Sequence, residues 1–161
     1  MAVREVLRYP DARLTTVAAS PDPADVARVA QDLVDTMRSF PRCVGVAAPQ
    51  LGEAVRMCVV DCTDHPKVPE PHGLLVLVDP VVVHAEGDAR GREGCLSIPD
   101  LTGDVHRPTA VIVEARDRAG APLRIEAAGF EARVLLHELD HLDGILFLDR
   151  AVAVFPRKSY G

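Results

Sequence analysis

The segment from residue 130 to 143 constrains the fold most, because it shows a helical apolar pattern late in the chain. Phe130, Val134 and Leu142 recur at helical spacing, and Gly144 follows at the position where a helix C-terminal cap belongs. A helix with this apolar face is expected to be buried, and any polar group that it carries then needs a partner. The polar side chains of this segment are therefore candidates for a functional site.

Two of those side chains have the spacing of metal ligands. His137 and His141 are four residues apart, so one helical face presents both imidazoles, about 6 Å apart along the axis. Glu138 lies beside the first histidine, where it can reach a water at an open metal position without binding the metal. A solvated helix in which these residues fall at this spacing by chance is the alternative, and a third ligand would decide against it.

Cys95 is the leading candidate for the third ligand. It lies in the segment 93–99, Glu-Gly-Cys-Leu-Ser-Ile-Pro, where the glycine suggests a strand edge that approaches another group closely. A catalytic metal site needs three protein ligands and an open position. Taken alone, Cys95 fits the ordinary role of a small buried hydrophobic residue better than that of a ligand.

A third segment, residues 43–50, reads Cys-Val-Gly-Val-Ala-Ala-Pro-Gln. Its small residues would let a backbone lie close to a ligand, and Gln50 could donate its amide NH₂ to a developing oxyanion. The alternative is a tight connection between a helix and a strand, with Gln50 on the surface.

Composition limits the setting of this site. The chain of 161 residues is long enough for one core and too short for two ordinary domains, so we expect a single catalytic domain over residues 1–161. Its formal net charge of -6, with mixed signs along the chain, argues against direct binding of nucleic acid. We find no signal peptide and no apolar stretch of membrane-spanning length, and therefore expect a cytoplasmic protein that does not bind membranes and whose cysteines are thiols.

The remaining patterns predict an α+β fold with largely antiparallel β-sheets. An amphipathic helix is expected over residues 23–39, with Asp22 as its N-cap and Pro23 at its first position. An exposed loop is expected over residues 63–73, and a hairpin turn at residues 118–120. Segments rich in β-branched residues predict strands over residues 55–61, 74–83, 109–116 and 122–127.

The three motifs together resemble those of the peptide deformylase family. The family pattern G-x-G-x-A-A-x-Q, E-G-C-L-S and H-E-x-D-H-L corresponds here to residues 43–50, 93–97 and 137–142, in the same order and at similar separations. The resemblance runs from about residue 3 to about residue 150. It implies a metal-dependent hydrolase that removes the N-formyl group from the N-terminal methionine of polypeptides emerging from the ribosome. It also implies Fe(II) as the working ion, although the ligand types are compatible with Zn(II), Ni(II) or Co(II) as well.

The resemblance also implies a role for each matching residue. Cys95, His137 and His141 would be the metal ligands, and Glu138 the general acid and base. Gln50 and the backbone N–H of Leu96 would form the oxyanion hole, and Glu93 and Arg107 a supporting ion pair. Substrate binding would fall to Val44, Gly45, Phe130, Arg133 and Val134.

The chain departs from the family pattern at several positions. Cys43 replaces the first glycine of the first motif, which we expect to alter local packing only. Leu136 stands where a glutamine usually precedes the first histidine, so a hydrogen bond that orients a ligand is expected to be missing. The sequence after Arg150 is short, and His106 precedes Arg107 where a proline is common.

Two other functions stay open at this point. An enzyme of the same fold could act on a different small N-acyl substrate, and kinetics on formyl-methionyl peptides against other formyl amides would separate the two. A protein with a purely structural metal site would need neither Glu138 nor Gln50, so their presence favours catalysis.

Overall fold

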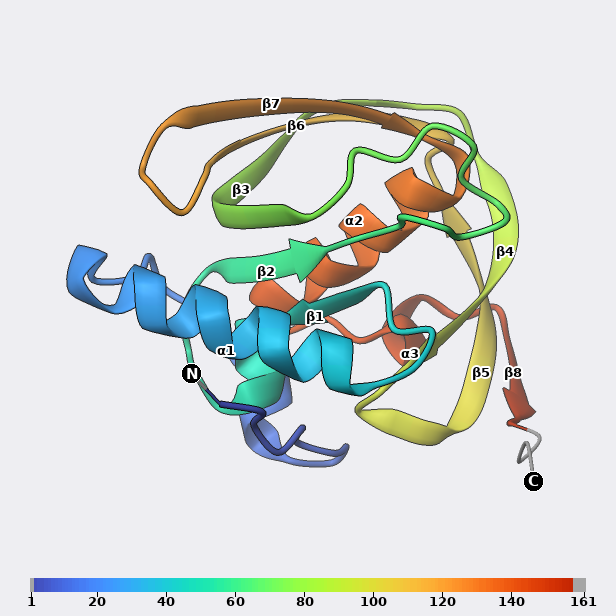
Figure 1. Ribbon diagram of the computed structural model, residues 1–161. Helices are drawn as coiled ribbons and strands as arrows, with labels where there is room; N and C mark the ends of the chain where they lie inside the picture. Colours follow the sequence, from blue (N-terminus) through green and yellow to red (C-terminus); the bar gives the residue numbers. More distant parts are fainter. Residues whose placement is uncertain (1, 158–161) are drawn as a thin grey trace.

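The computed structural model describes residues 2–157, which form two antiparallel sheets arranged around a central helix (Figure 1). The helices are α1 (Val26–Ser39), α2 (Gly129–Leu142) and α3 (Phe147–Arg150), with short 3₁₀ turns at Ala12–Thr15, Pro23–Asp25 and Ala48–Leu51. The strands are β1 (Gly45–Ala47), β2 (Met57–Val60), β3 (Leu75–Glu86), β4 (Ala89–Cys95), β5 (Ile98–Arg107), β6 (Ala110–Arg116), β7 (Pro122–Ala128) and β8 (Ala153–Pro156). The expected α+β fold with antiparallel sheets is confirmed.

The sheets have the orders β1-β2-β3-β6-β7 and β4-β5-β8. β1 is thus an edge strand of the larger sheet, and β4 is an edge strand of the smaller one. The predicted hairpin turn is confirmed, because β6 and β7 pair from Ala110–Ala128 to Arg116–Pro122 and Gly120 takes the positive φ of 86° that the turn requires.

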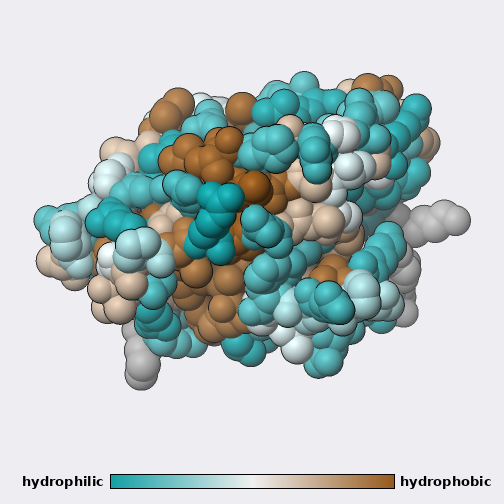
Figure 2. Space-filling view, turned by 90° about the horizontal axis from the view of Figure 1, so that it is seen from above, coloured by the Kyte–Doolittle hydropathy of each residue, from teal (hydrophilic) through white to brown (hydrophobic). Residues whose placement is uncertain are grey.

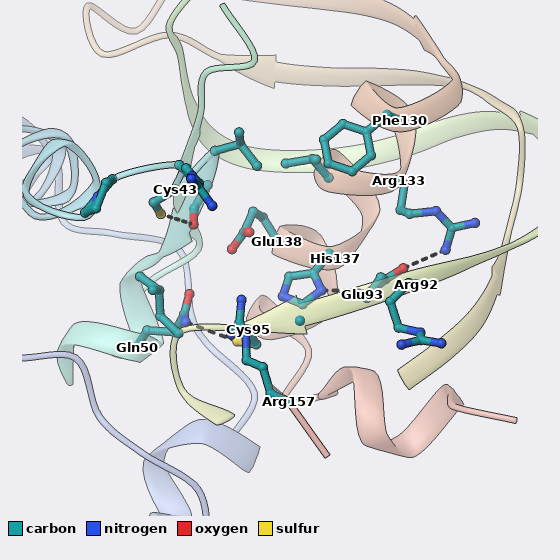
Figure 3. A pocket seen from close by; sticks show the side chains of 17 residues that line it. Cys43, Gln50, Arg92, Glu93, Cys95, Phe130, Arg133, His137, Glu138 and Arg157 are labelled. Atoms are coloured by element: carbon teal, nitrogen blue, oxygen red, sulfur yellow. Dashed lines mark hydrogen bonds and ion pairs between the residues drawn. The ribbon is translucent and has the colours of Figure 1, made fainter. Parts of the chain in front are cut away.

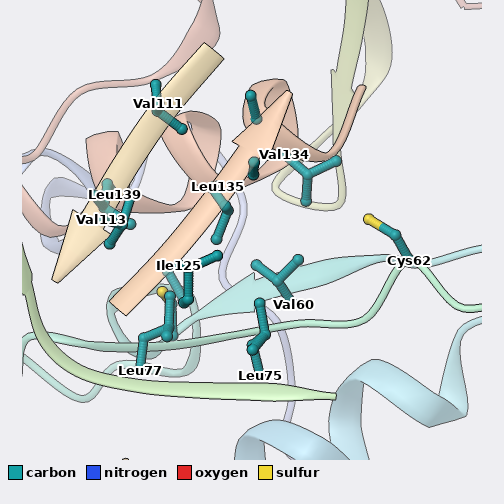
Figure 4. Packing of buried hydrophobic residues seen from close by; sticks show 14 of the residues in the cluster. Val60, Cys62, Leu75, Leu77, Val111, Val113, Ile125, Val134, Leu135 and Leu139 are labelled. Atoms are coloured by element: carbon teal, nitrogen blue, oxygen red, sulfur yellow. The ribbon is translucent and has the colours of Figure 1, made fainter. Parts of the chain in front are cut away.

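The five-stranded sheet is covered by a helix on each face, with α1 in front of β1 and β2 and α2 behind them (Figure 1). Side chains alternate along β2, so Met57 and Val59 pack with α1, whereas Cys58 and Val60 pack with α2. This burial of both faces explains why β2 is apolar throughout. Figure 4 shows the cluster on the α2 side, where Leu135 meets residues of β2, β3, β6 and β7.

Both predicted helices are confirmed with small changes at their ends. Asp22 accepts a hydrogen bond from the backbone of Ala24 as an N-cap does, but residues 23–25 form a 3₁₀ turn and the α-helix begins at Val26. α2 begins one residue earlier than expected and ends at Leu142. Gly144 follows with φ 72° and donates its N–H to the carbonyl of His141, which satisfies a free helix-end group.

Four strands were not predicted, namely β1, β4, β5 and β8, and β3 extends to Glu86 where the prediction stopped at Val83. The segment 63–73 forms no helix or strand, as predicted, but its expected exposure is only partly correct. Val68 is buried, and the ring of His65 stacks on Phe130 of α2 with centroids 4.2 Å apart. The loop therefore forms part of the wall around the N-terminal turn of α2.

The surface combines hydrophilic residues with a few exposed apolar ones. On the face seen from above in Figure 2, hydrophobic residues gather across the middle and hydrophilic residues surround them. Large exposed apolar side chains include Val81, Val83 and Val152. Within residues 2–157, the helices are all too short or too polar to cross a membrane.

Candidate metal centre and active site

Cys95, His137 and His141 meet inside the protein. Cys95 is the last residue of β4, and the two histidines lie one turn apart on α2. One ligand atom of each residue lies within 4.8 Å of the others, and all three residues are buried. Cys95 Sγ is 3.4 Å from His141 Nε2. The structure thus brings the three expected ligands together.

A buried carboxylate orients the first histidine. His137 Nδ1 lies 2.9 Å from Glu93 Oε1, so the Nε2 side of that ring is left for a metal. Arg107 donates two hydrogen bonds to Glu93, at 2.9 and 3.0 Å, and Arg133 donates a third at 2.9 Å. The predicted Glu93–Arg107 pair therefore exists, and it positions a ligand.

The cluster favours a thiolate at Cys95. Burial by itself raises the pKa of this thiol, but the charges and hydrogen bonds of His141 and His137 lower the pKa well below its usual range. Burial also lowers the pKa of His137, while its hydrogen bonds to Cys95 and Glu93 raise that pKa well above its usual range. The donor set of one thiolate and two imidazoles fits a divalent transition metal, which would take the place of these protons as the positive charge beside sulfur.

Glu138 projects beside this centre and has a free oxygen. It is buried, and within residues 2–157 its Oε1 atom has no hydrogen-bond partner. Burial raises the pKa of Glu138 above its usual range, although His137 and His141 lower it in part. Gly45 of β1 makes room for this side chain, since a Cβ at Gly45 would come within 2.7 Å of Glu138 Oε2.

Gln50 is fixed with its amide NH₂ toward the centre. It is 2% exposed, so the alternative of a surface residue is wrong. Its Oε1 accepts a hydrogen bond from the backbone of Ala47 at 2.9 Å. Its Nε2 donates to Ser97 Oγ at 3.0 Å and lies 3.5 Å from Cys95 Sγ. Leu96 is nearby, in the two-residue turn that joins β4 to β5.

A cavity of about 700 Å³ opens onto these groups between β1, β4 and α2 (Figure 3). Its lining includes Gln50, Leu96 and Glu138. It also includes all five residues that were expected to bind substrate, namely Val44, Gly45, Phe130, Arg133 and Val134. The role predicted for Arg133 changes in detail, because besides pairing with Glu93 its guanidinium donates hydrogen bonds to the backbone carbonyls of Ala89 and Val105. Its charged end is therefore committed to the protein, and it serves mainly to hold Glu93.

Two of the sequence departures, Cys43 and Leu136, have different consequences. Cys43 lines the cavity and donates its thiol hydrogen to the carbonyl of Gly45 at 3.3 Å, so its expected local packing role is supplemented by this contact. Leu136 packs against the hydrophobic cluster below α2. Among the described residues, His141 Nδ1 has no hydrogen-bond partner, so this ligand lacks the support that His137 has.

Several polar residues of the site were not found from sequence. Asp140 of α2 accepts hydrogen bonds from Arg107 and Arg150, both at 2.6 Å, and so extends the network below His137. Arg92 and Arg157 lie at the mouth of the cavity. Asp140 could have been noticed as a polar residue inside the metal-binding helix, whereas nothing in the spacing of the arginines indicates their convergence.

The fold and the site define a class of protein, an α+β metallohydrolase with one cysteine and two histidine ligands. A model of the polypeptide deformylase family matches residues 3–155, and the chain belongs to that family. Members of the family depend on a metal, and Cys95, His137 and His141 form a site that can hold it.

Individual relatives agree with this assignment. Peptide deformylase 2 of Vibrio cholerae is 45% identical over 150 residues, which cover 92% of this chain and 86% of the relative. A crystal structure of a peptide deformylase from Legionella pneumophila is 36% identical, with a TM-score of 0.84 over 92% of this chain and 86% of that one. A peptide deformylase from Acinetobacter baumannii, crystallised with Met-Ala-Ser bound, is 30% identical, with a TM-score of 0.83 over 93% and 100% of the two chains.

Proposed function

We propose that this chain removes the N-formyl group from the N-terminal methionine of newly made polypeptides and releases formate. Membership of the deformylase family supports the reaction. The observation that carries the proposal is the convergence on one cavity of the Cys95–His137–His141 cluster, the unpaired oxygen of Glu138 and the amide of Gln50. A purely structural metal site would need neither of the last two groups.

The substrate is proposed to lie extended between β1 and β4. Both are edge strands that line the cavity, and edge strands offer backbone groups for pairing with a peptide. Gly45 would hydrogen-bond the peptide backbone. The methionine side chain would enter the apolar part of the cavity beside Val44, Phe130 and Val134. The Acinetobacter relative was crystallised with Met-Ala-Ser bound, which agrees with a peptide as the ligand.

Each site residue has a distinct proposed role in the hydrolysis. Cys95, His137 and His141 would hold a divalent metal, which would supply Lewis-acid activation of water near neutral pH. Glu138 accepts the proton of the attacking water and delivers it to the departing amine, so that water and the formamide give formate and a free amine. Gln50 Nε2 and the N–H of Leu96 donate hydrogen bonds to the formyl oxygen as negative charge develops on it, at about 3 kcal/mol per donor.

The working metal is proposed to be Fe(II), with Zn(II), Ni(II) and Co(II) as ions that the ligands can also hold. The thiolate of Cys95 and the two imidazoles suit all four ions. The proposed substrates emerge from ribosomes, which makes the cytoplasm the proposed setting.

The decisive experiment measures formate release from formyl-Met-Ala by protein loaded anaerobically with Fe(II). Zn(II)-loaded protein and the Cys95→Ser variant serve as controls, and acetyl-Met-Ala and formyl amides without methionine serve as alternative substrates. We expect formyl-Met-Ala to be the preferred substrate and Cys95→Ser to be inactive. Faster turnover of another acyl amide would replace the proposal with a specialised hydrolase of the same fold.

A further inference from the structure

The mouth of the cavity carries positive charge although the chain as a whole is acidic. The formal net charge is -6. Nevertheless, four arginines and only two carboxylates contribute to the cavity lining, namely Arg42, Arg92, Arg133, Arg157, Glu93 and Glu138. Both carboxylates are buried, so a ligand that approaches from solvent meets the arginines first.

Two of the four arginines already have a carboxylate partner within the protein. Arg133 pairs with Glu93 at 2.9 Å. Arg92 pairs with Asp104 at 2.8 Å, and its guanidinium lies 4.0 Å from the centre of the Phe155 ring. These two side chains are fixed by contacts within the protein.

Arg42 and Arg157 are different, because both are exposed and, among residues 2–157, neither side chain has a carboxylate partner. Arg157 follows β8, and its backbone is held by a 2.8 Å hydrogen bond from its N–H to the carbonyl of Asp100. Its guanidinium lies 3.5 Å from where a Cβ of Gly94 would be. Figure 3 shows this side chain extending toward Cys95.

A bound peptide would pass these two arginines. Gly94 and Arg92 face outward on β4, whereas Glu93 and Cys95 are buried. An extended peptide advances about 3.3 Å per residue, so the second and third residues lie roughly 6–10 Å beyond the formyl group. Counted along β4 from Cys95, that distance reaches Glu93 and Arg92, beside Gly94, where the Arg157 guanidinium lies. Arg42 lines the cavity close to β1 in the chain.

We propose that Arg42 and Arg157 form a charge-selective rim that favours formyl-methionyl peptides with acidic side chains at the second and third residues. The inference rests on the proposed deformylase function and on the proposed direction of the peptide. Carboxylates there would pair with two guanidinium groups that have no carboxylate partner in the protein, whereas lysines would be repelled. Because the rim is exposed to solvent, the preference is modest and depends on ionic strength.

The test compares three peptide amides, formyl-Met-Glu-Glu, formyl-Met-Gln-Gln and formyl-Met-Lys-Lys. The amide removes the C-terminal carboxylate, so only the side chains differ in charge. Formate release is measured with metal-loaded wild type, Arg157→Gln, the double variant Arg42→Gln/Arg157→Gln, and Arg157→Lys. Arg118→Gln is the matched control, because Arg118 is an exposed arginine in the β6–β7 turn and does not line the cavity.

For wild type at low salt we expect kcat/KM to be about three- to tenfold higher for the Glu peptide than for the Lys peptide. The ratio should fall toward one in the double variant, stay high in Arg157→Lys and Arg118→Gln, and shrink as salt is raised to about 0.5 M. A wild-type ratio near one, or a ratio that the double variant retains, would overturn the rim while leaving the deformylase function intact. If none of the three peptides releases formate, both the rim and the deformylase function are refuted.

Discussion

Gln50 holds its side-chain amide in one orientation, because its oxygen accepts from Ala47 and its nitrogen donates to Ser97. If this amide stabilises the oxyanion, Gln50→Ala should lower kcat about 10²–10³-fold and change KM less, since the interaction strengthens only as charge develops. Metal content should stay the same. Steady-state kinetics and metal analysis test this, with Ser97→Ala as a milder control. A raised KM with unchanged kcat would make Gln50 a ground-state contact.

Glu138 reaches the site without belonging to the ligand cluster. Glu138→Gln keeps the shape of the side chain but removes its ability to take up a proton. The variant should therefore retain its metal and lose most of its activity. Metal analysis checks that the metal is retained, and formate release checks that the activity is lost. Loss of the metal, or near-normal turnover, would show that the assigned role is wrong.

Cys95 is set apart from the other cysteines by its protonation. Burial raises the pKa of the Cys43 and Cys62 thiols to about 12 and raises the pKa of Cys58 well above its usual range. These three thiols therefore stay protonated near neutral pH, whereas the lowered pKa of Cys95 favours its thiolate, and the thiolate is the oxidisable form. Peroxide should inactivate the Fe(II) enzyme together with oxidation of Cys95, as read by mass spectrometry. Equal inactivation with modification confined to the other three would contradict this.

For individual residues of the site, the sequence predicts a position correctly where local helix geometry determines it. The i, i+4 spacing of His137 and His141 sufficed to predict their common helix face. Cys95 and Gln50 needed the family resemblance, because each had an ordinary structural alternative. Arg157 could not be predicted at all, since its place at the cavity depends on how β8 pairs with β5.

Among the elements, the β4–β5 hairpin and α2 are joined by Arg107. This residue of β5 binds Glu93 of β4 and Asp140 of α2, and all three are buried. Arg107→Met should destabilise the protein by about 3–5 kcal/mol, because buried carboxylates lose a partner. Urea unfolding measures the change in the free energy of unfolding.

The matched control for that measurement is Arg124→Met. Arg124 also lies on a strand and pairs with a carboxylate, Glu114, but both side chains are about half exposed, at 55% and 54%. Its loss should cost roughly 0–1 kcal/mol. Similar effects of the two substitutions would mean that the buried network does not hold the hairpin to the helix.

The strands that were predicted and those that were missed differ in burial. β2 and the first half of β3 are apolar because helices or strands cover them, so their composition identifies them. β4 carries two arginines, a glutamate and two glycines, and β5 contains a proline, a glycine and two aspartates. These two strands are stabilised by pairing with each other, and the pattern of residues within one strand does not show which strand it pairs with.

At the level of the whole molecule, a bound metal would link β4 of the smaller sheet, through Cys95, to α2, through His137 and His141; α2 packs against the larger sheet. A ligand that binds only the folded state at 100 times its Kd adds about 2.7 kcal/mol of stability. Loading the metal-free protein with Zn(II) should therefore raise Tm by roughly 5–10 °C, measured by calorimetry. Cys95→Ala should lose most of the increment. An equal increment in that variant would place the binding elsewhere.

The extent of the domain stays a prediction. The family model covers residues 3–155, and the structure describes residues 2–157, so the first residue and the last four of the expected domain lie outside the described part. The core and both sheets fall within the matched range, except for Pro156 at the end of β8.

The edge strands β1 and β4 at the cavity bear on the range of peptides that such an enzyme can accept. β1 and β4 each end a sheet, and a peptide between them would join the two sheets into one. The groups that such a strand uses for pairing are its own amides and carbonyls, which every polypeptide possesses whatever its sequence. In the proposed binding mode, the architecture would therefore accept nascent chains as a class, and the side chains around the cavity would adjust how quickly individual chains are processed.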